Sequence, residues 1–349
     1  MLPVFRSMSS VASFCILLIV LLCLPLVTLW LGHPPREQAY AGMSDEAGLI
    51  GPHVREIFYD PYDADVLFMG SSLVRAGIYE PMVERALSAH LDRPAHVATL
   101  ALNWQGLDLQ YFLLRDYLNT HHAALIVWNL PVPGSRHVEP HVEAFRWIRF
   151  GEYSDALSGL PLRYRLALYG DMVLGAPREL LSHLRPNLLG KEEIAAQITA
   201  DKAGYYGKSF VPEPTDSATM PLLEQSYEDP PYKLVHAVGP ALNPYEAHFA
   251  RKILELAQEK HSTIVLLHIP IDSEQGLVYM PERSNWADAL ATDAPMIGVP
   301  SAVLFDNVDN ATFHNYYRDQ HFNINGSLLF TRSILPAILR AYDEGNRHE

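Results

Sequence analysis

Cysteine is scarce in this chain, with only Cys15 and Cys23 among 349 residues, and both lie in an apolar N-terminal segment. The rest of the sequence has no thiol to form a disulfide, act as a nucleophile or bind zinc. Basic residues are also few, and the net charge of −14 argues against a nucleic-acid partner. Neither glycine-rich fingerprint of a nucleotide-binding loop occurs. We therefore expect no cofactor and no resident metal.

A long apolar run stands at the start of the chain. Residues 11–31 carry no charge, and about 20 such residues span a bilayer as a helix. A cleaved signal peptide usually has a shorter apolar core, of about 7–15 residues. Cleavage after the Ala-Tyr-Ala sequence at 39–41 is the alternative. We expect residues 1–10 in the cytoplasm, an uncleaved transmembrane signal anchor at 11–31, and the remainder outside the cytoplasm, in a bacterial periplasm.

The sequence after the apolar run predicts a linker followed by one domain. Residues 32–60 predict a juxtamembrane linker and residues 61–349 an extracytoplasmic domain. Strands are expected at 65–70, 95–102, 123–130, 262–270 and 301–306, and helices at 81–91, 107–122, 244–261 and 325–345. Continuously apolar strands separated by helices favour an α/β three-layer sandwich around a central parallel sheet. Between about 134 and 240 the alternation stops, which predicts a helical insertion.

Polar residues follow the expected strands, at the sheet edge where ligands bind to open parallel sheets. A doubled serine ending at Ser72 follows the first strand, Gly106 follows the second, and Asn129 ends the third. Asp319 and His321 precede the last helix. A carboxylate beside a histidine can orient the imidazole so that it takes a proton from a serine. Each feature alone also has a structural explanation, as a helix cap or a turn residue.

Together these motifs resemble the SGNH (GDSL-like) hydrolase superfamily. The resemblance rests on "VLFMGSS", a glycine after the second strand, an asparagine after the third, and "DQHFNING" before the last helix. The N-terminal anchor and the Gly-Ser-Ser are similar to a membrane-anchored branch that acts on cell-envelope polymers. That branch includes the alginate O-acetylation proteins and the teichoic-acid D-alanylation protein. The resemblance covers about residues 63–130 and 244–345, and it implies a flavodoxin-like sheet.

The resemblance implies a role for each site residue. Ser72 matches the nucleophile, His321 its base and Asp319 the residue that orients the histidine. An oxyanion hole is implied at Gly106, Asn129 and Asn103. Only Gln320 separates the Asp from the His, a spacing similar to that of the polysaccharide O-acetyltransferase branch. The usual Gly-x-Asn-Asp of the third block is absent.

The implied function is that of a serine O-acyltransferase or esterase. It would act on an envelope or secreted polysaccharide through an acyl-enzyme, with a membrane-bound O-acyltransferase partner supplying the acyl group. The alternative is a catalytically silent protein on the same fold that binds a partner or carrier in a polymer-modification complex. The unusual third block motivates this alternative.

Other residues leave further alternatives. Asp306 or Asp309 is an alternative to Asp319 as the orienting carboxylate. His268 ends the fourth expected strand, where it either lines the crevice or packs as a hydrogen-bonded core residue. After the third strand, every second residue of one segment is a possible metal ligand, namely His137, Glu139 and His141. In an extended chain these three side chains would lie on one face and could bind a metal.

Overall fold

A five-stranded parallel sheet forms the centre of the molecule. The computed structural model describes residues 7–31, 36, 40, 50–101, 106–129, 244–278, 294–309, 312–318 and 320–347, with single residues between 162 and 181. The sheet has the order β2-β1-β3-β4-β5. Its strands are β1 (Ala64–Gly70), β2 (Val97–Ala101), β3 (Ala123–Asn129), β4 (Thr263–Leu267) and β5 (Met296–Ile297). The expected α/β fold with a central parallel sheet is confirmed.

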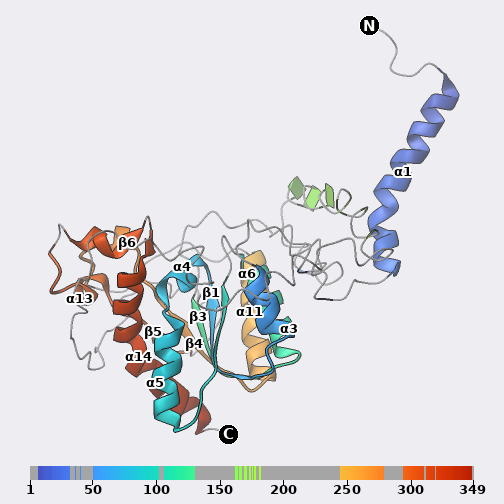
Figure 1. Cartoon of the computed structure of the whole chain (residues 1–349). Helices are drawn as coiled ribbons and strands as arrows, with labels where there is room; N and C mark the ends of the chain where they lie inside the picture. The colour runs from blue at the N-terminus through green and yellow to red at the C-terminus, as the bar shows by residue number, and fades with distance from the viewer. Residues whose placement is uncertain are drawn as a thin grey trace.

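Helices cover both faces of this sheet. They are α3 (Ile50–Phe58), α4 (Ser72–Gly77), α5 (Glu80–Leu91), α6 (Leu107–Leu118), α11 (Pro244–Glu259), α13 (Ser301–Leu304) and α14 (Ile324–Asn346). Figure 1 shows α3, α6 and α11 on one side of the sheet and α4, α5 and α14 on the other. Around the sheet there are also two 3-10 turns, η3 (Asp272–Glu274) and η4 (Phe313–Tyr316), and the antiparallel pair β6 (Tyr317–Arg318) and β7 (His321–Phe322). The result is three layers.

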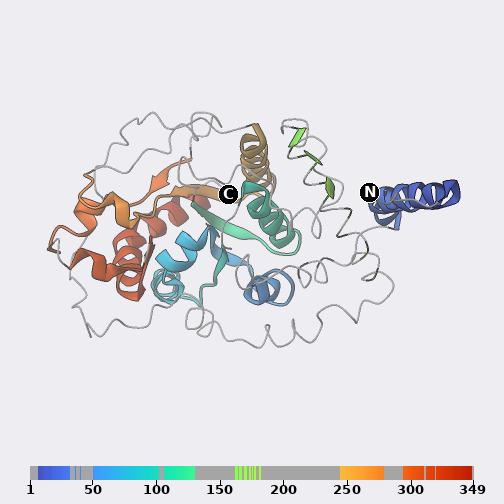
Figure 2. The same cartoon turned by 90° about the horizontal axis from the view of Figure 1, so that it is seen from above.

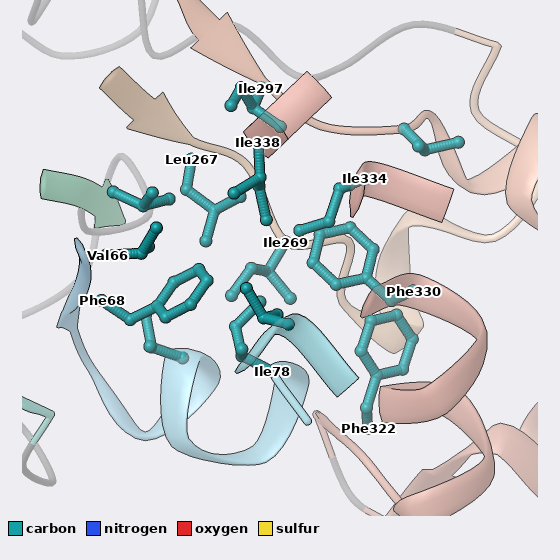
Figure 3. Close-up of a cluster of buried hydrophobic side chains, with 14 of the residues drawn as sticks. Val66, Phe68, Ile78, Leu267, Ile269, Ile297, Phe322, Phe330, Ile334 and Ile338 are labelled. Carbon is teal, nitrogen blue, oxygen red and sulfur yellow. The ribbon is translucent and has the colours of Figure 1, made fainter. Parts of the chain in front are cut away.

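The hydrophobic core consists of two clusters, one on each face of the sheet. All seven residues of β1 are buried, because successive side chains point to opposite faces and helices cover both. Leu67 belongs to the cluster under α6 and α11. Val66 and Phe68 belong to the other cluster, with Ile334 and Ile338 of α14 (Figure 3). This two-sided burial explains the continuous apolar run in the sequence.

The prediction of a strand at 301–306 is wrong. Ser301–Leu304 forms helix α13 instead, because the amides of residues 303 and 304 both donate to the Pro300 carbonyl and close a helical turn. The edge strand lies earlier, at Met296–Ile297. A short apolar run does not distinguish a strand from a buried helical turn by its periodicity.

The range 32–60, expected as a linker, contains a packed helix. In α3, Val54 and Ile57 are almost fully buried against the sheet and α6. Earlier in the same range, Tyr40 is fully buried and its hydroxyl donates to Asp116 of α6 at 3.0 Å. The folded domain therefore begins well before the first strand.

The N-terminal apolar run forms helix α1 (Met8–Leu31). This helix lies apart from the sheet and its covering helices in both views (Figures 1 and 2). Apolar side chains along it are exposed, among them Phe14, Ile16 and Leu17. Within the described residues, no helix combines the length and the apolar character needed to cross a membrane. The expected insertion at about 134–240 lies almost wholly outside the described residues.

Candidate active site

The turn from β1 into α4 contains the doubled serine. Ser71 is the N-cap residue of α4, and its Oγ accepts a hydrogen bond from the Leu73 amide at 3.1 Å. This is the ordinary structural role of a serine at a helix start. The preceding Gly70 leaves no space for a side chain, because a Cβ there would lie 2.8 Å from the Cβ of Asn129. The glycine thus lets the ends of β1 and β3 approach closely beneath the serines.

The second serine contacts a histidine from the far end of the chain. The Oγ of Ser72 lies 2.8 Å from Nε2 of His321, although 249 positions separate the two residues. This distance is within the range of about 2.6–3.2 Å expected of a nucleophile and its general base. Both side chains are partly buried, so the pair keeps access to solvent. A hydroxyl held in this way can transfer its proton to the imidazole as it attacks a carbonyl.

A short hairpin and a capped helix hold His321 in place. Strand β7 pairs with β6, with Arg318 opposite His321. Two residues later, Oδ1 of Asn323 accepts hydrogen bonds from the amides of Asn325 at 2.9 Å and Gly326 at 3.1 Å, which caps α14. Asn323 is not among the site residues predicted from the sequence, although an asparagine at the start of a helix is a usual cap signal. The cap ties the histidine to the first turn of α14.

Aromatic packing supports the hairpin from below. The rings of Tyr317 and Phe322 lie 4.7 Å apart between centroids, and Phe322 packs on Phe330 of α14 at 5.6 Å. Burial, and then the charges of Glu274 and Asp272, raise the pKa of Tyr317 far above its ordinary value. The phenol therefore stays neutral. The strand that carries the histidine is therefore held in place by packed aromatic side chains.

The expected oxyanion-hole residues follow the strands on either side of β1. Gly106 follows β2 and is the N-cap residue of α6, with an extended backbone at φ −83° and ψ 161°. Asn129 ends β3, is buried, and donates from Nδ2 to the Leu267 carbonyl at 2.9 Å. Asn103 lies outside the described residues. Gly106 and Asn129 thus occupy the same carboxyl edge of the sheet as Ser72.

The orienting carboxylate is the third expected member of the site. Asp319 lies outside the described residues. The side-chain hydrogen bonds described for its two alternatives are local, since Asp309 accepts from the Thr312 amide at 2.9 Å and Asp306 accepts from the side chain of Asn307 at 2.8 Å. These bonds shape the loop before the histidine hairpin.

Two further sequence candidates have different outcomes. His268 is fully buried after β4, and its Nε2 lies 3.0 Å from Oε2 of Glu274. This favours the packed, hydrogen-bonded alternative for His268. The alternating His-x-Glu-x-His segment at residues 137–141 lies outside the described residues.

Comparison of the chain with models of protein families, with curated proteins and with solved structures finds no match.

Proposed function

We propose that this chain is a serine O-acyltransferase or esterase of the SGNH (GDSL-like) type that acts on an envelope or secreted polysaccharide. The observation that carries the proposal is the 2.8 Å hydrogen bond between Ser72 Oγ and His321 Nε2. The strand order supports it as well. In sheets of order 2-1-3-4-5, ligands bind where the order reverses, between β1 and β3, and the serine follows β1.

The proposed reaction has two acyl transfers. Ser72 Oγ attacks the carbonyl carbon of the acyl donor while His321 Nε2 takes the hydroxyl proton. When the tetrahedral intermediate collapses, the ester C–O bond breaks and the imidazolium returns its proton to the departing alcohol. A sugar hydroxyl or a water then attacks the acyl-serine, and the histidine passes the proton of this second nucleophile to Ser72 Oγ. The enzyme is regenerated and the acyl group has moved.

Backbone amides near the serine are the proposed oxyanion donors. The Leu73 amide is already bonded to Ser71 Oγ, so we assign this role to the amides of Ser72 and Gly106. One such donor typically stabilises the transition state by about 3–4 kcal/mol. We propose Asp319 as the residue that orients the histidine, in line with the resemblance.

An N-terminal membrane tether completes the proposal. We propose a single-pass anchor with the domain in the periplasm, on the basis of the uncharged run at 11–31 and the exposed apolar side chains of α1, whereas the helices of the described residues include none that meets the length and apolar character of a membrane span. Tethering raises the effective concentration of a membrane-borne acyl source at the site. A membrane-bound O-acyltransferase is the partner we propose to supply the acyl group.

Labelling of the full chain with a fluorophosphonate probe tests the proposal, because the probe modifies only an activated serine. The wild-type protein is expected to be labelled, Ser72→Ala is expected to lose labelling, and His321→Gln is expected to slow it by about 10²–10⁴-fold. Ser71→Ala is the matched control, since it removes the neighbouring hydroxyl and leaves the Ser72–His321 bond in place.

Two results would contradict the enzyme proposal. Labelling that persists in Ser72→Ala places the reactive hydroxyl elsewhere. A wild-type protein that shows a native circular dichroism spectrum and no labelling favours the silent partner- or carrier-binding alternative.

A further inference from the structure

A cluster of two carboxylates and one imidazole lies at the amino ends of the strands, opposite the carboxyl ends where Ser72 lies. Glu56 belongs to the last turn of α3, Asp60 precedes β1, and His96 comes directly before β2. The serine pair follows the other end of β1. Seven strand residues separate the two edges, which is about 20 Å at a rise of about 3.3 Å per residue. The cluster is therefore distinct from the candidate active site.

The three side chains converge at distances typical of ligands around one ion. Nε2 of His96 lies 3.6 Å from Oε2 of Glu56 and 3.9 Å from Oδ2 of Asp60. One ligand atom from each residue lies within 4.8 Å of the other two. These separations exceed a direct hydrogen bond of about 2.7–3.2 Å. Ligands at about 2.0–2.2 Å from a tetrahedral ion are about 3.3–3.6 Å apart, close to the separations found here.

Neighbouring groups hold the second oxygen of each carboxylate. Arg55 Nη2 lies 3.4 Å from Oε1 of Glu56, so the ion pair uses the oxygen that is not turned toward the histidine. The Tyr62 amide donates to Oδ1 of Asp60 at 3.2 Å. In both residues the other oxygen is the one nearest the imidazole. This arrangement orients the carboxylates as the outer contacts of a metal site do.

The histidine is held independently of the carboxylates. Its backbone amide donates to Oδ2 of Asp65 at 2.9 Å, and the Tyr62 ring packs on the imidazole with 5.8 Å between centroids. These contacts fix the position of His96 just before the start of β2. The three ligand atoms thus come from segments that are each positioned by other bonds.

Burial adds an electrostatic reason for a cation. Glu56 is only 4% exposed, and the side chains of Asp60 and His96 are 15% and 16% exposed. Arg55 pairs with Glu56 and offsets one negative charge. Two carboxylates held together away from water still repel each other, so a further positive charge between them lowers the cost of burying them. A divalent ion bound to Glu56 Oε2 and Asp60 Oδ2 supplies that charge, and a proton on the histidine is the alternative source.

We infer that Glu56 Oε2, Asp60 Oδ2 and His96 Nε2 form a binding site for a divalent transition-metal cation of the Zn²⁺ class. One imidazole and two carboxylates are ligands that Zn²⁺ accepts, with water in the fourth position. The bound ion joins the end of α3 to the beginning of β2 and so fastens the start of the domain to the sheet. This role is structural and does not depend on the chemistry at Ser72.

Metal-dependent stability of the full chain in detergent tests the inference. The protein is stripped with a chelator, and its melting temperature is measured with and without added Zn²⁺. At a Zn²⁺ concentration of about 100 times Kd, the wild type is expected to gain about 5 °C or more. His96→Gln is expected to lose this gain. His90→Gln is the matched control, because His90 Nε2 faces a single described carboxylate, Asp343, at 2.8 Å, and it is expected to keep the gain.

A second measurement covers the case in which His96→Gln does not fold. Co²⁺ bound to the wild type is expected to show visible absorption bands of a low-symmetry, near-tetrahedral site, and Zn²⁺ is expected to displace it at one equivalent. No bound metal together with an unchanged melting temperature would overturn the inference and leave a protonated His96 as the cation between the carboxylates. A gain that survives in His96→Gln and disappears in His137→Gln would also overturn it.

Discussion

Ser71 and Ser72 are adjacent in the chain, and their hydroxyls bond in different directions. Ser71 Oγ accepts from the Leu73 amide inside the first turn of α4, whereas Ser72 Oγ meets His321 from the last quarter of the sequence. One serine therefore stabilises local structure, and the other joins two distant segments at the sheet edge. Stability and reactivity measurements separate the two roles.

Replacing Ser71 is expected to reduce stability more than replacing Ser72, whereas only the replacement of Ser72 is expected to abolish labelling. Ser71→Ala removes the cap and is expected to lower the free energy of unfolding by about 1 kcal/mol. Ser72→Ala removes a hydroxyl at a partly exposed position and is expected to lower it by less than about 0.5 kcal/mol. Urea unfolding followed by circular dichroism measures both. Equal losses in the two variants would mean that Ser72 is also a structural residue.

Asn323 is expected to be the residue that fixes the position of the histidine hairpin. Its Oδ1 caps α14, and its Nδ2 donates to the Asn315 carbonyl at 2.5 Å. Asn323→Ala loses all of these bonds and is expected to cost about 1–2 kcal/mol of unfolding free energy. Asn323→Asp keeps the cap acceptor and is expected to recover about half of the loss. If Asp recovers nothing, the bond to Asn315 matters more than the cap.

The parallel sheet could be predicted because its strands can be recognised in the sequence as apolar runs. Strand β1, for example, is buried on both faces along its whole length and therefore reads as a nearly continuous apolar run. The meeting of Ser72 and His321 was predicted from the rule that ligands bind at the carboxyl ends of parallel strands, together with the resemblance. The 2.8 Å bond is the geometry that this prediction requires.

Other features have no such signal in the sequence. Helix α13 replaced an expected strand because four or five apolar residues fit either structure, and the choice depended on the amides that close onto Pro300. The cluster of Glu56, Asp60 and His96 depends on how α3 lies against the start of β2. No spacing rule links residues about 40 positions apart, so that cluster emerges only from the packing.

Two glycines in α14 offer a matched test of the site geometry. A Cβ on Gly326 would lie 2.5 Å from Cδ1 of Phe322, the neighbour of His321 in β7. A Cβ on Gly345, near the other end of the same helix, would lie 2.5 Å from Oγ1 of Thr263. Both alanine variants are therefore overpacked, and each is expected to lose about 1–3 kcal/mol of unfolding free energy.

Only the first variant is expected to change reactivity. Gly326→Ala displaces the strand that carries the histidine, and a shift of about 1 Å can cost about 10²-fold in rate. Fluorophosphonate labelling of Gly326→Ala is expected to slow by at least about 10-fold, while Gly345→Ala labels at the wild-type rate. Equal labelling rates in the two variants would show that the hairpin position does not control the serine.

Asp65 is a carboxylate at the start of β1 whose pKa the fold lowers. Burial alone would raise the pKa of Asp65, but hydrogen bonds from Arg93, from the His96 amide and from the Tyr342 hydroxyl outweigh it and lower the pKa. The Arg93 Nη1 and Tyr342 contacts are both 3.1 Å and the amide contact is 2.9 Å. The ionised carboxylate thus joins β1, the start of β2 and the end of α14.

Because its pKa is lowered, Asp65 makes the free energy of unfolding depend on pH in the acidic range. Because the folded pKa lies below the unfolded value of about 3.9, the contribution of Asp65 is complete above that value and is lost as pH falls through the folded pKa. Asp65→Asn is expected to cost about 1–3 kcal/mol of unfolding free energy at pH 7. The difference from the wild type is expected to shrink below about pH 4. Urea unfolding at several pH values with a chelator present measures this, and exposed Asp92→Asn serves as the control. A difference that stays constant down to pH 3 would mean that the hydrogen bonds of Asp65 do not require its charge.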